Sequence, residues 1–123
     1  MQPVPSIFPQ AYLDIAAERG ANNAAILSQA GLDASLFARR NNEISMLQMH
    51  RLIELVLAAV GDGGIGVDVG WRLPPTAFGN FGYALLCSET MADVMQLCQR
   101  FWHLVGRGVS LSVQEHGDLC VID

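Results

Sequence analysis

Two amphipathic segments, each opened by a capping box, limit most strongly what this chain can fold into. In the first, Ser45 stands three residues before Gln48 and apolar residues follow at helical spacing. In the second, Thr90 stands three residues before Asp93 and apolar residues again recur every three and four positions. We therefore expect a mainly helical chain in which the helix after Ser45 is central. Its core-spaced residues are Met46, Met49, Leu52, Ile53, Val56, Leu57 and Val60.

Shorter helices are predicted on the N-terminal side of these segments. The first should run from about Pro9 to Arg19 and stop at Gly20, since proline suits a first helical turn and glycine a left-handed end. A second should be capped by Asn22, and Asp33 can cap a further turn. The inner stripe of the first helix is predicted to be Tyr12, Leu13, Ala16 and Ala17.

Glycine and proline interrupt the helical pattern in the middle of the chain. Five glycines fall within 61–70 and two prolines follow at 74–75, so a helix over 65–71 should be short or irregular. Residues 76–86 favour a helix, although 83–87 could equally form a buried strand.

The last fifteen residues change from helical to strand periodicity. Val109, Leu111 and Val113 alternate with serines, and 115–118 predict a turn into a strand over 119–122. That strand is apolar on both faces, so we expect further chain or a second molecule to complete the sheet. The predicted fold class is α+β and mostly α: an N-terminal helical bundle followed by a small antiparallel sheet that a C-terminal hairpin begins.

Composition excludes several classes of protein. Apolar residues are 51% of the 123 and charged residues 15%, with a mean hydropathy of +0.30, which excludes a disordered tail. The net charge is −5 and there is no lysine, so the chain should bind nucleic acid or anionic membranes poorly. Three cysteines without a CxxC spacing favour a reducing compartment. With no signal peptide and no long apolar run, we expect a cytoplasmic protein without membrane contact.

Residues 13–31 have the spacing of a helix-turn-helix, with Ala16, Gly20 and Ile26 at its packing, turn and core offsets. The recognition helix would be NNAAILSQAG, which offers no arginine or lysine to contact bases or phosphates. Two packed helices in a bundle need the same small residues, so DNA binding here is only an alternative.

Catalytic and metal motifs are not supported by the sequence. The segment GDGGIG lacks the Lys-Ser/Thr of a P-loop and follows a predicted helix, not a strand. His50, His103 or His116 could be combined with Cys87 or Ser88, but no nucleophile elbow supports a hydrolase. No catalytic residue, cofactor or metal is predicted.

Aromatic side chains and methionines gather in the second half of the chain. Such enrichment ordinarily marks a core, and a ligand pocket is the other interpretation. In that pocket an arginine, whether Arg72, Arg100 or Arg107, could hold a carboxylate by two hydrogen bonds. The predicted ligand-binding residues are Trp71, Arg72, Phe78, Phe81, Tyr83, Trp102 and Arg107.

Three local signatures occur in a characteristic order: AGLD at 30–33 before the helix opened by Ser45, FGYALLCSET at 81–90, and RFWHLV at 100–105. In this order and spacing, from about Pro9 onward, the chain resembles the N-terminal effector domain of AraC/XylS-type transcription regulators. The resemblance covers nearly the whole chain, although no single motif is highly specific.

The resemblance implies a regulator in which this chain, residues 1–123, is the N-terminal part of the sensor domain. A separate C-terminal domain with helix-turn-helix motifs, absent from this chain, would bind DNA. The implied partners are a small-molecule effector of unknown identity and, for dimerisation, a second copy. A stand-alone ligand-binding module or small enzyme that uses the aromatic residues is the alternative.

Overall fold

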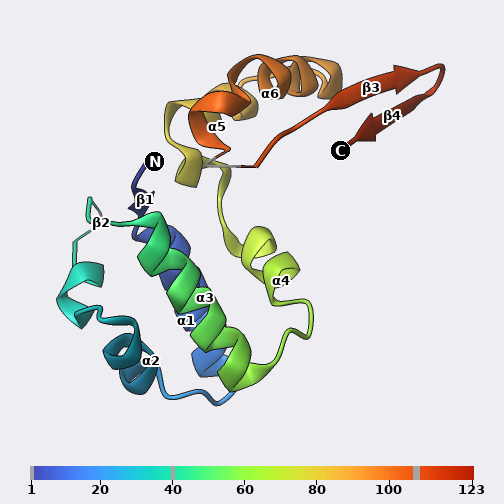
Figure 1. The fold of residues 1–123 in the computed structure, drawn as a ribbon. Helices are drawn as coiled ribbons and strands as arrows, with labels where there is room; N and C mark the ends of the chain where they lie inside the picture. The colour runs from blue at the N-terminus through green and yellow to red at the C-terminus, as the bar shows by residue number, and fades with distance from the viewer. Residues whose placement is uncertain (1, 40, 107–108) are drawn as a thin grey trace. The chain divides into compact units, whose positions relative to one another are not determined.

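The computed structural model describes residues 2–39, 41–106 and 109–123. Within these residues the chain forms six α-helices, two 3-10 helices and two antiparallel sheets of two strands each. It divides into two compact units, residues 1–74 and 75–123, whose elements are labelled in Figure 1. The predicted α+β class, mostly α, is confirmed.

The first unit is a bundle of helices around α3. Helix α3 packs against both α1 and α2, while α1 also packs against α4 (Figure 1). The elements of the first unit are β1 (Val4–Pro5), α1 (Ile7–Glu18), α2 (Asn23–Ala30), η1 (Ala34–Phe37), β2 (Glu43–Ile44), α3 (Met46–Val60) and α4 (Ile65–Arg72).

Helix α3 is central to this unit, as predicted. Leu52 and Val56 are fully buried and Met49 is buried beside them. The capping box is formed: the amide of Gln48 donates to Ser45 Oγ at 3.1 Å, and Gln48 Oε1 accepts from the amide of Ser45 at 2.9 Å. The helix therefore starts where the sequence predicts, because two otherwise unpaired amides are satisfied there.

Helix α1 differs in part from the prediction. It begins at Ile7, two residues before Pro9, and the predicted stop at Gly20 is confirmed by a φ of +89°. Ala17 is exposed, whereas Ile15 is buried, so the predicted inner stripe was partly wrong. The buried face is wider than one stripe because α1 contacts both α3 and α4.

The predicted caps of the next two elements are confirmed. The side chain of Asn22 accepts a hydrogen bond from the amide of Ala25 at 3.3 Å. Asp33 Oδ1 accepts from the amide of Ser35 at 2.9 Å and so starts η1. Both caps supply an acceptor for a helical amide that has no partner in its own helix.

The sequence analysis missed the sheet formed by β1 and β2. Val4 pairs with Ile44, both buried, and the amide of Ser6 donates to the carbonyl of Asn42 at 2.8 Å. Two-residue strands carry no period of their own, so only the tertiary contact shows them.

The second unit contains η2 (Pro75–Phe78), α5 (Asn80–Leu86), α6 (Met91–Val105), β3 (Val113–His116) and β4 (Leu119–Ile122). The helical prediction for 76–86 is confirmed, with a break at Gly79, whose φ is +60°. The second capping box is also confirmed, since the amide of Asp93 donates to Thr90 Oγ1 at 3.2 Å and Asp93 Oδ2 accepts from the amide of Thr90 at 3.1 Å.

The predicted hairpin exists with different bounds. His116 pairs with Leu119, so the turn is the two residues 117–118 and not 115–118. Gly117 at φ +61° allows such a tight turn. The first strand begins at Val113 and not at Val109, because the carbonyl of Val109 accepts a hydrogen bond from the side chain of α6 residue Trp102 instead of joining a ladder.

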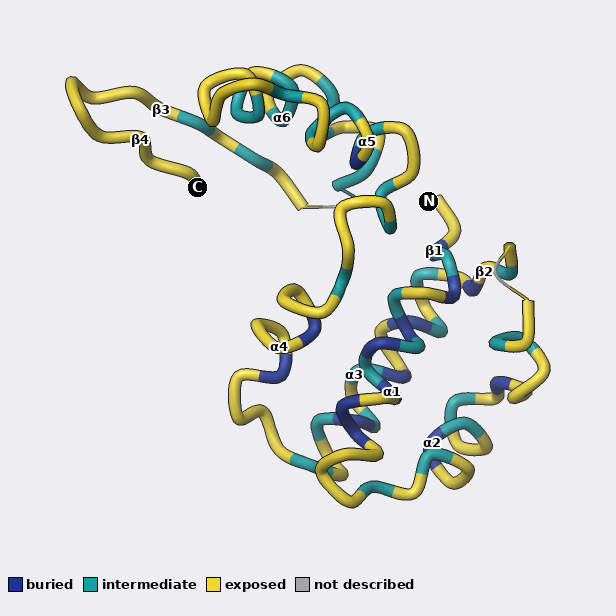
Figure 2. The backbone as a smooth tube through the Cα atoms, turned by 180° about the vertical axis from the view of Figure 1, so that it is seen from behind, coloured by how far each residue is buried: buried dark blue, intermediate teal, exposed yellow. Residues whose placement is uncertain are grey.

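The second unit has little apolar core in its described residues. Gly82 is the one buried residue among those described in this unit, and all four residues of β4 are exposed (Figure 2). Helix α6 has a marked apolar face but no buried residue. Burial of apolar surface therefore stabilises the first unit far more than the second.

We predict that Leu52→Ala lowers the free energy of unfolding by about 2–5 kcal/mol, because it leaves a cavity in the core of the first unit. Leu47→Ala on the same helix is the matched control: Leu47 is 80% exposed, and its loss should cost at most about 0.5 kcal/mol. Urea denaturation followed by circular dichroism measures both, and equal effects would contradict the described core.

Candidate functional site

The predicted ligand-binding residues fall in both units. Trp71 and Arg72 end α4 in the first unit. The second unit holds four more, and Arg107 lies outside the described residues. Those four are Phe78 in η2, Phe81 and Tyr83 in α5, and Trp102 in α6.

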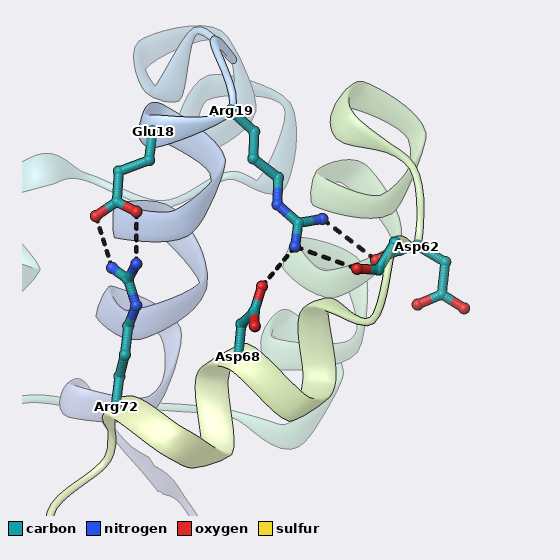
Figure 3. Close-up of polar contacts among 6 residues, drawn as sticks. Glu18, Arg19, Asp62, Asp68 and Arg72 are labelled. Atoms are coloured by element: carbon teal, nitrogen blue, oxygen red, sulfur yellow. Dashed lines mark hydrogen bonds and ion pairs between the residues drawn. The ribbon is translucent and has the colours of Figure 1, made fainter.

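Arg72 is engaged by a carboxylate of the protein itself. Its guanidinium donates two hydrogen bonds to Glu18 at the end of α1, one to each carboxylate oxygen, at 2.6 and 2.5 Å (Figure 3). The neighbouring Trp71 side chain is 91% exposed. Two hydrogen bonds from an arginine to one carboxylate are the geometry that the sequence predicted for a ligand, but here Glu18 provides the carboxylate.

A second arginine joins the same two helices. Arg19, which follows α1, pairs with Asp68 of α4 at 2.6 Å and donates to the carbonyls of Asp62 and Gly63 at 3.4 Å (Figure 3). Glu18 and Arg19, adjacent at the C-terminal end of α1, thus hold two residues of α4 that are one helical turn apart. We call Glu18, Arg19, Asp68 and Arg72 the α1–α4 clamp.

The Glu18–Arg72 pair of the clamp favours the charged forms of both its members. The hydrogen bonds from Arg72 hold the pKa of Glu18 below its usual value, and the Glu18 carboxylate raises the pKa of Arg72. A ligand carboxylate that takes this end-on position on Arg72 would displace Glu18.

In the second unit, a glycine brings two elements with predicted site residues together. The helix α5 packs on η2, and a Cβ at Gly82 would lie 1.7 Å from the carbonyl oxygen of Pro75. Phe78 and Phe81 are half-buried beside this contact, while Tyr83 is 58% exposed. The close approach requires glycine, and this requirement gave no recognisable signal in the sequence.

Trp102 has a structural partner. Its indole N–H donates to the carbonyl of Val109 at 2.8 Å. Its ring packs so close to Gly106 that a Cβ added there would lie 2.4 Å from Nε1. Gln99 similarly donates to the carbonyl of Val113 at 2.8 Å. These side chains of α6 hold the segment that leads into β3.

Arg100 and Cys98 are two further polar side chains of α6. The Arg100 guanidinium lies 5.2 Å from the ring centroid of Phe101, a cation–π distance. Burial raises the pKa of the Cys98 thiol, which therefore stays protonated at neutral pH. Among the described residues, no group of three His, Cys, Asp or Glu side chains is placed to hold a metal ion. The described helices also include none long and apolar enough to cross a membrane.

Surface hollows lie away from the predicted site residues. An open hollow of about 520 Å³ lies over α2 and the turn into η1, and one of about 510 Å³ lies around β2. A third, of about 330 Å³, lies on the polar side of α6. None of the three is lined by a predicted ligand-binding residue.

The described residues thus form two mainly helical units with exposed apolar side chains. A family model, the N-terminal arabinose-binding domain of AraC transcription regulators, matches residues 20–123. The chain belongs to this family, as the sequence resemblance indicated, and the family is one of regulator domains, not of enzymes.

Curated relatives agree with this assignment. The chain is 27% identical over 110 residues to the ornithine utilization regulator of Pseudomonas aeruginosa, covering 89% of this chain and 32% of that protein. Uncharacterized HTH-type transcriptional regulators of Mycobacterium tuberculosis and Mycobacterium bovis are 27% identical over 111 residues, again 89% of this chain and 32% of each relative. The chain thus spans about a third of the length of these relatives. No solved structure gives a significant match.

We predict that acid weakens the clamp. The folded-state pKa of Glu18 is lowered, so its stabilisation is complete above its ordinary pKa of 4.5 and is lost as the pH falls through the folded-state value. The stability difference between the native chain and Glu18→Gln should therefore be largest at neutral pH and narrow in acid, measured by urea denaturation across pH.

Glu54→Gln is the control for this experiment, because it removes the exposed Arg51–Glu54 pair at 3.5 Å. Its effect on stability at neutral pH should be much smaller. A Glu18→Gln difference that stays constant or widens on acidification would contradict the described clamp.

We also predict that Gly82→Ala disrupts the contact between α5 and η2. The new methyl would meet backbone, which moves only with the helix. Protection of the α5 amides from hydrogen exchange should fall by roughly tenfold or more. Gly66→Ala is the control, because a Cβ at this position of α4 meets nothing within 4 Å. It should leave the protection of the α4 amides unchanged or raise it. Unchanged α5 protection in Gly82→Ala would show that this close contact is absent.

Proposed function

We propose that this chain is the effector-sensing part of a transcription regulator that controls transcription in response to a small molecule. The family match over residues 20–123 is the observation that carries the proposal. Residues 1–123 would form the N-terminal part of the sensor, and a separate helix-turn-helix domain of the whole cytoplasmic regulator would bind DNA. The chain itself would have no enzymatic activity.

The surface of α2 supports the assignment of DNA binding to a separate domain. Its exposed positions include Ala24, Ala25, Ser28 and Gln29, none of them basic. A recognition helix needs side chains that reach base edges and phosphates. The structural explanation of residues 13–31, two helices packed in a bundle, accounts for α1 and α2 without DNA.

The effector would contact the aromatic residues of the second unit. Phe78, Phe81, Tyr83 and Trp102 lie on η2, α5 and α6, which are linked through the contacts of α5. Partly exposed aromatic rings can cover the apolar body of a ligand. Trp71 and Arg72 of the first unit, and Arg107, stay predictions from the sequence, with an arginine for an anionic group.

A second role, dimerisation, is favoured by one observation. Residues 119–122 of β4 are apolar and all exposed, and a strand edge of this kind can pair with another copy. Sedimentation of the complete regulator tests it, and a monomer at every concentration would refute it.

The sensor proposal is tested with the complete regulator. A thermal-shift screen should begin with L-ornithine and L-arabinose, which occur in the names of a relative and of the family, and extend to other metabolites. A ligand at about one hundred times its Kd should stabilise the protein by about 2.7 kcal/mol. No saturable ligand, together with DNA binding that no metabolite changes, would refute the proposal.

With such a ligand in hand, we predict that Tyr83→Ala raises its Kd by about tenfold, which corresponds to about 1.4 kcal/mol. Tyr83 is largely exposed, so its loss should leave the fold intact. Leu47→Ala, an exposed apolar side chain in the first unit, is the control. Calorimetry measures both, and an unchanged Kd for Tyr83→Ala would remove this residue from the site.

A further inference from the structure

Helix α4 is attached to the first unit by few apolar contacts. Ile65 and Val69 are its buried residues, at 2% and 5% exposure. The other six residues are exposed, including the large side chains Val67 and Trp71. By comparison, α1 has five buried residues, so the apolar contribution that holds α4 is smaller than the one that holds α1.

The α1–α4 clamp supplies the remaining attachment and fixes one register. Asp68 lies opposite Arg19 and Arg72 lies opposite Glu18 (Figure 3). Sliding α4 by one turn would bring Arg72 toward Arg19, a pair of like charges. All four side chains are between 26% and 58% exposed, so salt can screen these ion pairs.

The segment before α4 can absorb a large backbone rotation. Gly61, Gly63 and Gly64 have φ values of +75°, +43° and +75°. Glycine changes between such conformations at little cost, as hinges require. Arg19 also contacts this segment through the carbonyls of Asp62 and Gly63. A single arginine thus holds both the helix and its hinge.

From these contacts we propose that α4 is a latch, which opens from α1 and closes again while α1, α2 and α3 remain folded. Burial of Ile65 and Val69 and the clamp together hold the closed state, and opening turns about residues 61–64. Opening uncovers Ile65 and Val69 and releases Arg72 from Glu18. It also moves the end of the first unit, since Arg72 is followed by Leu73, Pro74 and the second unit. The proposal does not rest on the sensor function.

Hydrogen exchange of the 123-residue chain, read by mass spectrometry, tests the latch. Raising NaCl from about 0.05 M to about 1 M should lower the protection of amides 65–72 by about fivefold, since it screens the ion pairs. Protection in α1 and α3 should stay within about twofold in the same sample. Loss of protection in all three helices together would overturn the proposal.

Charge reversal gives a second test of the latch. Glu18→Arg should lower α4 protection by about tenfold, and adding Arg72→Glu should restore most of it, because the pair is re-formed with exchanged charges. Glu54→Arg, which breaks the exposed pair on α3, is the control and should change α4 by less than about twofold.

Two results of the charge-reversal test would overturn the proposal. One is α4 protection that Glu18→Arg leaves unchanged, and the other is a double variant no better than the single one. The milder Glu18→Gln replaces Glu18→Arg if the reversal unfolds α1 and α3, and it should lower α4 protection by about threefold with those helices intact.

Discussion

The packing of α3 against α1 and α2 is the interaction on which the described structure depends. Leu52 and Val56 are fully buried there, and the capping box at Ser45 fixes where the helix begins. Burial of such side chains contributes about 1.5–3 kcal/mol each, more than any exposed polar contact. The caps of α2 and η1 then place short elements around a helix that is already fixed.

Stability is distributed unevenly along the chain. The core residues all lie at or before Val69, whereas the described residues of the second unit bury only Gly82. Hydrogen bonds from Gln99 and Trp102 hold the segment before β3, but hydrogen bonds alone contribute little net stability. The described residues of the second unit thus leave apolar side chains exposed.

Local signals predicted the helices well, and contacts between distant residues were not predictable. Both capping boxes, the Asn22 cap and the Gly20 stop depend on neighbours within a few residues. The β1–β2 pair joins residues 40 apart, as Val4 pairs with Ile44, and the Glu18–Arg72 pair spans 54. Neither contact leaves a periodic pattern, and a single sequence does not show which distant residues meet. The requirement for glycine at position 82 was missed for the same reason, because it arises from a close contact with the backbone of Pro75 that only the structure shows.

Arg72 links the predicted ligand site to the latch. Glu18 accepts from both terminal nitrogens of its guanidinium in the closed arrangement, so a carboxylate ligand that takes the same end-on position competes with Glu18. Thermodynamic linkage then requires that a ligand bound in that position favour the open α4, and that opening strengthen the binding of that ligand by the same factor. For a ligand that contacts only the aromatic residues of the second unit, linkage through Arg72 does not apply, and its binding need not favour the open α4. The site that an effector uses therefore decides whether α4 responds to it.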